Sequence, residues 1–206
     1  MDQPGFDTLD SRMMERCIAL SGASGASGEY PYAAIICRGG EIVAESTNRV
    51  KHDRDVTRHA EVVVISLAQK ILGTVSLDDC TLYSNAEPCA FCSYAVRESR
   101  IRRVVYGLSS PHMGGVSKWP VLSDRDLSSA MPEVFAPPPE IVAGFMAEEA
   151  EEALKQWSPL ATFILEKRGL LDVTPGGTEA RVEESEKRSR LMMLLRRSFF
   201  DRFGRR

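Results

Sequence analysis

Apolar residues in the first quarter of the chain follow first a helical and then a strand pattern. Residues 9–19 carry apolar side chains at three- and four-residue spacings, which predicts an amphipathic helix. The small residues at positions 21–28 are expected to break this helix. Residues 33–37 form a continuous apolar run typical of a buried strand, and Gly39-Gly40 predicts a tight hairpin into a second strand at residues 42–44. The first two strands are therefore expected to be antiparallel neighbours.

The middle of the chain alternates helices and strands. Residues 48–57 are polar and loop-like, and residues 60–72 have a helical composition. A short strand is predicted at 80–84, and a second helix is expected to begin at Pro88 and to run through about residue 99. Residues 101–106 predict another strand. Right-handed crossovers would make the strands in this strand-helix-strand-helix-strand order parallel, with helices on the sheet faces.

Beyond Gly107, which is expected to end the preceding strand, the pattern is less regular. Residues 109–124 contain two prolines and two glycines, which indicates a long ordered loop or lid, and Trp119 in it is a candidate substrate contact. A fifth strand is expected within residues 133–142 despite three consecutive prolines. Residues 147–167 are predicted to be helical, with an interruption at Pro159.

Length and composition predict one main domain. The chain has 206 residues, of which 43% are hydrophobic, so it can bury one substantial core. We assign residues 1–171 to this domain. Residues 172–188 are rich in Gly, Glu and Ser and are expected to be a disordered linker. Residues 189–206 form a basic, partly apolar C-terminal segment.

Charge is distributed unevenly along the chain. Residues 187–206 hold eight Lys or Arg against one Asp, a net charge of +7, so the preceding residues carry −10 of the total of −3. An acidic body disfavours a partner whose affinity depends on phosphate contacts. The basic segment interleaves arginines with phenylalanines, a pattern suited to RNA, to an anionic membrane surface or to docking on its own domain or a second subunit.

The sequence predicts a cytoplasmic protein with no membrane span. No apolar run approaches the roughly 20 residues that a spanning helix requires. Residues 1–10 are acidic and polar and lack the features of a secretory signal. Five cysteines at irregular spacing fit metal ligands plus buried thiols better than a disulfide framework, and Cys17 and Cys37 are the expected buried thiols.

One motif carries the candidate chemistry. His59-Ala60-Glu61 is followed, after 26 residues, by Pro88-Cys89-Ala90-Phe91-Cys92, which gives the zinc deaminase pattern H-x-E…P-C-x-x-C. Ligation by His59, Cys89 and Cys92 leaves the fourth tetrahedral position of Zn²⁺ open to water. Zinc lowers the pKa of that water, and Glu61 is expected to move its proton to the substrate.

The alternative is a structural zinc site in a non-catalytic binding module. A closed site needs a fourth ligand, for which Cys80 and His52 are the available residues. Neither of them explains why a carboxylate follows His59 by two positions. The complete motif therefore favours catalysis.

At these residues the chain resembles the cytidine and deoxycytidylate deaminase superfamily, in the branch of guanine deaminases, yeast-type cytosine deaminases and bacterial tRNA adenosine deaminases. The segments PYAAII, ESTNRV, TLYSNAEPC and SRIRRVVYG are similar to family segments in the expected order. The resemblance implies an α/β fold, a three-layer α/β/α sandwich around a five-stranded mixed sheet, and assembly as a homodimer. It also implies that the Asn48 side chain and the Ala60 backbone amide bind the substrate base. Glu87 matches a family glutamate, for which a supporting surface role is as plausible as a catalytic one.

The sequence departs from the tRNA adenosine deaminases after Gly107, where it runs LSSPHMGGVSKWPVLSD. His112, Met113 and Trp119 in this loop either stack on a base or simply pack against the fold. We therefore predict zinc-dependent hydrolytic deamination of a guanine-, cytosine- or adenine-type nucleobase or nucleoside, with release of ammonia. The alternative substrate is tRNA, in which adenosine would be edited to inosine.

Overall fold

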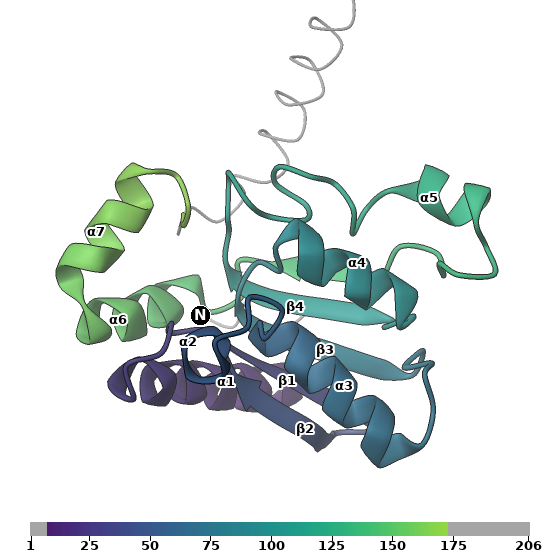
Figure 1. Ribbon diagram of the computed structural model, residues 1–206, viewed down its shortest axis with the longest axis horizontal. Helices are drawn as coiled ribbons and strands as arrows, with labels where there is room; N and C mark the ends of the chain where they lie inside the picture. Colours follow the sequence, from purple (N-terminus) through teal and green to yellow (C-terminus); the bar gives the residue numbers. More distant parts are fainter. Residues whose placement is uncertain (1–7, 173–206) are drawn as a thin grey trace, which may run out of the picture.

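The computed structural model describes residues 8–172 (Figure 1). Its elements are, in chain order, α1 (Thr8–Ala26), β1 (Ala33–Arg38), β2 (Glu41–Thr47), α2 (Val50–Asp53), α3 (Ala60–Leu72), β3 (Cys80–Ala86), α4 (Ala90–Glu98), β4 (Arg103–Leu108), α5 (Arg125–Ala130), β5 (Glu140–Ala143), α6 (Ala147–Trp157) and α7 (Pro159–Lys167). The C-terminal segment and all but the first residue of the predicted linker lie outside the described residues. The proposed domain boundaries therefore stay predictions.

The five strands form one mixed sheet in the order β2-β1-β3-β4-β5. β1 is antiparallel to β2 and to β3, while β3, β4 and β5 pair in parallel. The predicted hairpin at Gly39-Gly40 is confirmed, because both glycines have positive φ and join β1 to β2. β2, β3 and β4 run in one direction, as the crossover argument predicts. The fifth strand is confirmed as β5, which begins only after the prolines.

Helices cover both faces of the sheet, which confirms the three-layer sandwich (Figure 1). Successive side chains of β1 point to opposite faces. Ala34 and Ile36 belong to the core beneath α3 and α4, whereas Ile35 and Cys37 belong to the core beneath α1. A third apolar cluster lies between α6 and the ends of β3 and β4. Because β1 is buried on both faces, its sequence is a continuous apolar run.

The small-residue segment at 21–28 does not break the first helix, so this prediction is wrong. α1 continues through it to Ala26. Ser21, Ser24 and Gly25 are buried, and a Cβ on Gly25 would lie 2.5 Å from Cδ1 of Trp157. Small side chains are therefore required here because α6 packs closely against α1, and this packing outweighs their weak helix propensity.

Two boundaries around the second half of the motif also differ from prediction. α4 begins at Ala90 rather than at Pro88, because Cys89 has an extended backbone and is the N-cap residue. Gly107 lies inside β4 and does not end it. A Cβ at Gly107 would lie 2.8 Å from the carbonyl oxygen of Asn85, so glycine is needed for close approach of backbone and not for a turn. The short helix α2 occupies part of the predicted 48–57 loop.

The predicted long loop after β4 is confirmed, and one buried arginine orders it. The Arg97 side chain of α4 is 1% exposed and donates to the carbonyl oxygens of Val121, Asp124 and Ala136. Burial removes the Arg97 guanidinium from water and lowers the pKa of this side chain, because the charged form loses its hydration. The carbonyl oxygens replace that lost hydration, so Arg97 anchors a segment that has few large apolar side chains.

The last two helices meet at Pro159, as predicted. Pro159 is the first residue of α7, and the Ser158 hydroxyl caps this helix by accepting from the Ala161 N–H.

Among the described residues, no helix is long and apolar enough to cross a membrane.

Candidate active site

The histidine and the first cysteine of the motif each stand directly before a helix. His59 is the N-cap residue of α3 and Cys89 is the N-cap residue of α4, and neither side chain caps its own helix. α3 follows β2 and α4 follows β3, two strands that point the same way, so both helices begin beyond the same edge of the sheet. The carboxyl ends of strands are the usual location of ligand sites in such sheets.

The three predicted metal ligands meet at this edge. His59 Nδ1 lies 3.6 Å from Cys89 Sγ and 3.3 Å from Cys92 Sγ, and the two sulfurs are 3.6 Å apart. Tetrahedral zinc, with Zn–S bonds of about 2.3 Å and a Zn–N bond of about 2.0 Å, would place two sulfurs roughly 3.8 Å apart and nitrogen roughly 3.5 Å from sulfur. The three atoms therefore already have the spacing of a zinc site.

The charges of the two thiols also fit a cation. A hydrogen bond with Cys92 and a second with His59 lower the pKa of Cys89 to about 4, although burial acts in the opposite direction. The contact with Cys89, together with burial, raises the pKa of Cys92. Two adjacent buried thiolates repel each other, so ligation by both sulfurs requires a positive ion between them. One imidazole and two thiolates suit zinc.

Glu61 lies next to the ligands, in the first turn of α3. Its side chain is buried and lines the same cavity as His59 and Cys89. Burial raises the pKa of Glu61 to about 7, and the negative charge of Cys89 contributes in the same direction. A carboxyl group with a pKa near neutrality can both accept and release a proton, which is the property required of a proton shuttle.

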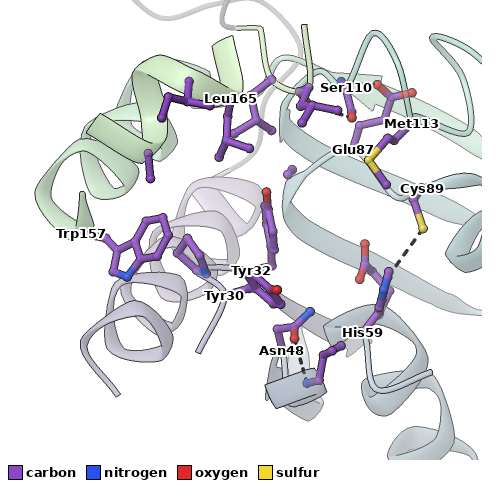
Figure 2. Close-up of a pocket in the computed structure, with 18 of the residues that line it drawn as sticks. Tyr30, Tyr32, Asn48, His59, Glu87, Cys89, Ser110, Met113, Trp157 and Leu165 are labelled. Carbon is purple, nitrogen blue, oxygen red and sulfur yellow. Dashed lines mark hydrogen bonds between the residues drawn. The ribbon is translucent and has the colours of Figure 1, made fainter. Parts of the chain in front are cut away.

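A cavity of about 470 Å³ opens in front of these residues (Figure 2). We call the side formed by His59, Glu61 and Cys89 the zinc wall. The opposite side, the outer wall, is formed by apolar residues of α6, α7 and the segment that follows: Trp157, Ala161, Ile164, Leu165, Leu170 and Leu171. The cavity therefore has metal-ligating and ionisable side chains on one side and a hydrophobic surface on the other. This arrangement is expected for the binding of a flat, partly apolar ring.

Comparison with known proteins agrees with this geometry. The family model for the cytidine and deoxycytidylate deaminase zinc-binding region matches residues 7–108, which include all three ligands. A tRNA-specific adenosine deaminase of Agrobacterium fabrum is 32% identical over 147 residues, which cover 71% of this chain and 92% of that protein. The chain belongs to the cytidine and deoxycytidylate deaminase family.

Two further relatives show the range of this family. The guanine deaminase of Bacillus subtilis is 42% identical over 89 residues, or 43% of this chain and 56% of that protein. A solved structure from work on A-to-I editing by tRNA:A34 deaminases superimposes with a TM-score of 0.60 at 31% identity, covering 69% of this chain and 99% of that one. The protein is thus a zinc-dependent deaminase, a hydrolase that acts on C–N bonds.

The two predicted base-binding groups of this deaminase lie in different surroundings. Asn48 is 5% exposed and lines the cavity, but its Oδ1 accepts the N–H of Val50, so the side chain also stabilises a turn. Ala60 is fully buried at the start of α3, where a backbone N–H has no acceptor within the helix. Their substrate contacts stay predictions.

Sequence reasoning did not identify Tyr32 as a site residue. Tyr32 directly precedes β1 and lines the cavity (Figure 2). Burial raises the pKa of Tyr32 to about 12, so the hydroxyl stays protonated and can donate to a substrate. In the sequence, Tyr32 shows only as a side chain with a hydroxyl group directly before the apolar run 33–37. This pattern does not reveal that Tyr32 faces a cavity.

The structure separates the three loop residues that the sequence singled out. Met113 lines the cavity, whereas Trp119 is 55% exposed and is not part of the lining. The His112 ring lies against Gly169, where an added Cβ would be 2.8 Å from the ring. Of the two roles left open for Glu87, the surface role is excluded, because this residue is 4% exposed and its carboxylate accepts hydrogen bonds from the loop.

Proposed function

We propose that this deaminase converts a free nucleobase or nucleoside, with an exocyclic amine of the guanine, cytosine or adenine type, to the corresponding keto compound and ammonia. The observation that carries the proposal is the composition of the cavity. Within the part of the chain that the structure describes, its lining contains no Lys or Arg. A cavity of about 470 Å³ with an apolar outer wall accepts one base and its sugar and offers no cation to a phosphate.

The roles of the site residues follow from their positions. His59, Cys89 and Cys92 would hold zinc, which would supply a water of lowered pKa. Glu61 would pass one proton of this water to the ring nitrogen and the second to the departing amine, so that water and the aminated base give the keto product and ammonia. Asn48 and the Ala60 amide orient the base, which leaves its amine-bearing carbon at the zinc wall.

A second candidate is editing of adenosine to inosine in tRNA. The observation that favours it is the relationship to a tRNA-specific adenosine deaminase over 92% of that relative's length. The basic residues 187–206 offer phosphate contacts that the cavity lacks. On this hypothesis the anticodon base enters the same cavity.

The test is a comparison of substrates with the full-length, zinc-loaded protein. Ammonia release is measured with guanine, adenine, cytosine and their nucleosides, and inosine formation is measured with a tRNA anticodon stem-loop. We expect turnover of at least one free compound to exceed turnover of the stem-loop. Inosine in the stem-loop, with no release from any free compound, would reject the proposal in favour of editing.

We further propose that the protein is a cytoplasmic homodimer. Exposed aromatic side chains support the dimer, because Phe91 and Tyr94 on α4 are 48% and 44% exposed. Phe91 also contacts the ligand His59 edge-on, with ring centroids 5.7 Å apart. Light scattering that gives the mass of one chain at micromolar concentration would exclude the dimer.

A further inference from the structure

We propose that Glu87 is a positioning residue that sets the location of the substrate-facing loop, residues 110–117, relative to the zinc ligands. Glu87 stands two positions before Cys89, in the short connection between β3 and α4. It lines the cavity, but its carboxylate hydrogen bonds within the described residues go to the loop and not to His59, Cys89 or Cys92. This inference rests on the proposed function, because the loop supplies Ser110 and Met113 to the cavity.

All four hydrogen bonds of the Glu87 carboxylate go to this loop. Oε1 accepts from the backbone N–H groups of Val116 and Ser117, at 2.8 and 2.7 Å. Oε2 accepts from the N–H of Ser110 at 2.7 Å and from the hydroxyl of Ser117 at 2.6 Å. These four bonds satisfy the buried carboxylate.

The loop is also joined to the ligand segment through the backbone. The N–H of Gly115 donates to the Pro88 carbonyl oxygen at 2.8 Å, and the N–H of Ala90 donates to the Met113 carbonyl oxygen at 3.1 Å. A Cβ on Gly114 would collide with the Glu87 carboxylate, which explains why a glycine stands there. Backbone hydrogen bonds and the Glu87 carboxylate therefore both connect the loop to the segment that carries Cys89.

The same loop holds the end of the outer wall. The Ser110 hydroxyl donates to the Leu170 carbonyl oxygen at 2.8 Å, and Ser109 and Asp172 exchange two backbone hydrogen bonds at 3.0 and 2.9 Å. Leu170 and Leu171 are part of the outer wall. A displacement of the loop would thus change the distance between the two walls of the cavity.

Glutamine is an informative replacement, because it keeps the shape of the side chain while it removes the negative charge and replaces one acceptor oxygen with a donor. The carboxylate accepts from four donors, whereas the NH₂ group of Gln is itself a donor. In Glu87→Gln this group must face either the N–H groups of Val116 and Ser117 or the N–H of Ser110. Two buried donors would then point at each other, so the loop is expected to move away.

The experiment compares Glu87→Gln with the matched control Glu98→Gln, whose side chain is exposed on α4. For Glu87→Gln we expect KM for the best free compound to rise about 10-fold or more, with a smaller change in kcat and an unchanged zinc content. We also expect faster hydrogen exchange in residues 108–118. The control should match the wild type in all four measurements.

Hydrogen exchange and zinc content separate this inference from the proposed function, because neither needs a substrate. If the wild type deaminates no free compound but Glu87→Gln loses protection in the loop, the proposed function fails and the positioning role stands. Unchanged exchange, or a loss confined to kcat, would overturn the positioning role. If Glu87→Gln does not fold, Ser117→Ala removes a single donor to Oε2 and should raise exchange in the same residues.

Discussion

The zinc wall and the outer wall face each other across one cavity, but they are built in different ways. The zinc wall comes from the first turns of two helices, and its ligands follow a short local motif. The outer wall comes from α6, α7 and Leu170–Leu171, and only long-range packing places it across the cavity from His59 and Cys89. On the proposed function, the first wall carries the reaction and the second contacts the base.

The largest effect is expected for loss of a zinc ligand. Cys92→Ser removes a thiolate ligand that is fully buried beside Cys89, so zinc should be lost and turnover should fall by about 1,000-fold or more. Zinc content by mass spectrometry and ammonia release check both expectations. Cys80→Ser, at a buried cysteine away from the site, is the matched control and should retain zinc. Full zinc occupancy in Cys92→Ser would show that another group completes the site.

The outer wall can be tested from a remote position by a pair of glycine variants. A Cβ at Gly25 would press on Trp157, so Gly25→Ala should lower stability by about 1–3 kcal/mol and raise KM several-fold. Gly22→Ala lies on the same helix in open space and should instead gain about 0.5–1 kcal/mol. Thermal unfolding and steady-state kinetics are the measurements. Equal behaviour of the two variants would contradict the close packing of α1 against α6.

The difference between the walls also explains what could be predicted from the sequence. The sheet, its hairpin and the ligands were predictable, because periodicity and the H-x-E and P-C-x-x-C spacings are local signals. The breaker expected at residues 21–28 was wrong, because the same small residues suit a loop or a helix pressed against Trp157. Tyr32 and Glu87 could not be assigned, since the cavity and the loop that they serve are brought together only by the fold.

The smallest effect is expected for the basic segment. If the substrate is a free base or nucleoside, deletion of residues 187–206 should change kcat/KM by less than about twofold, because the cavity lies within the described residues and phosphate contacts play no part. Steady-state kinetics with the best free compound checks this. A loss of activity on the anticodon stem-loop alone would show that the segment serves RNA.

The most direct test of the account concerns Glu61, the only carboxylate of the zinc wall. Zinc content and ammonia release are measured together for Glu61→Gln and for the control Glu98→Gln. We predict that Glu61→Gln keeps about one zinc per chain, because it is not one of the three ligands, and loses about 100-fold or more in turnover, because the proton has no carrier. Wild-type turnover in zinc-loaded Glu61→Gln would contradict the mechanism.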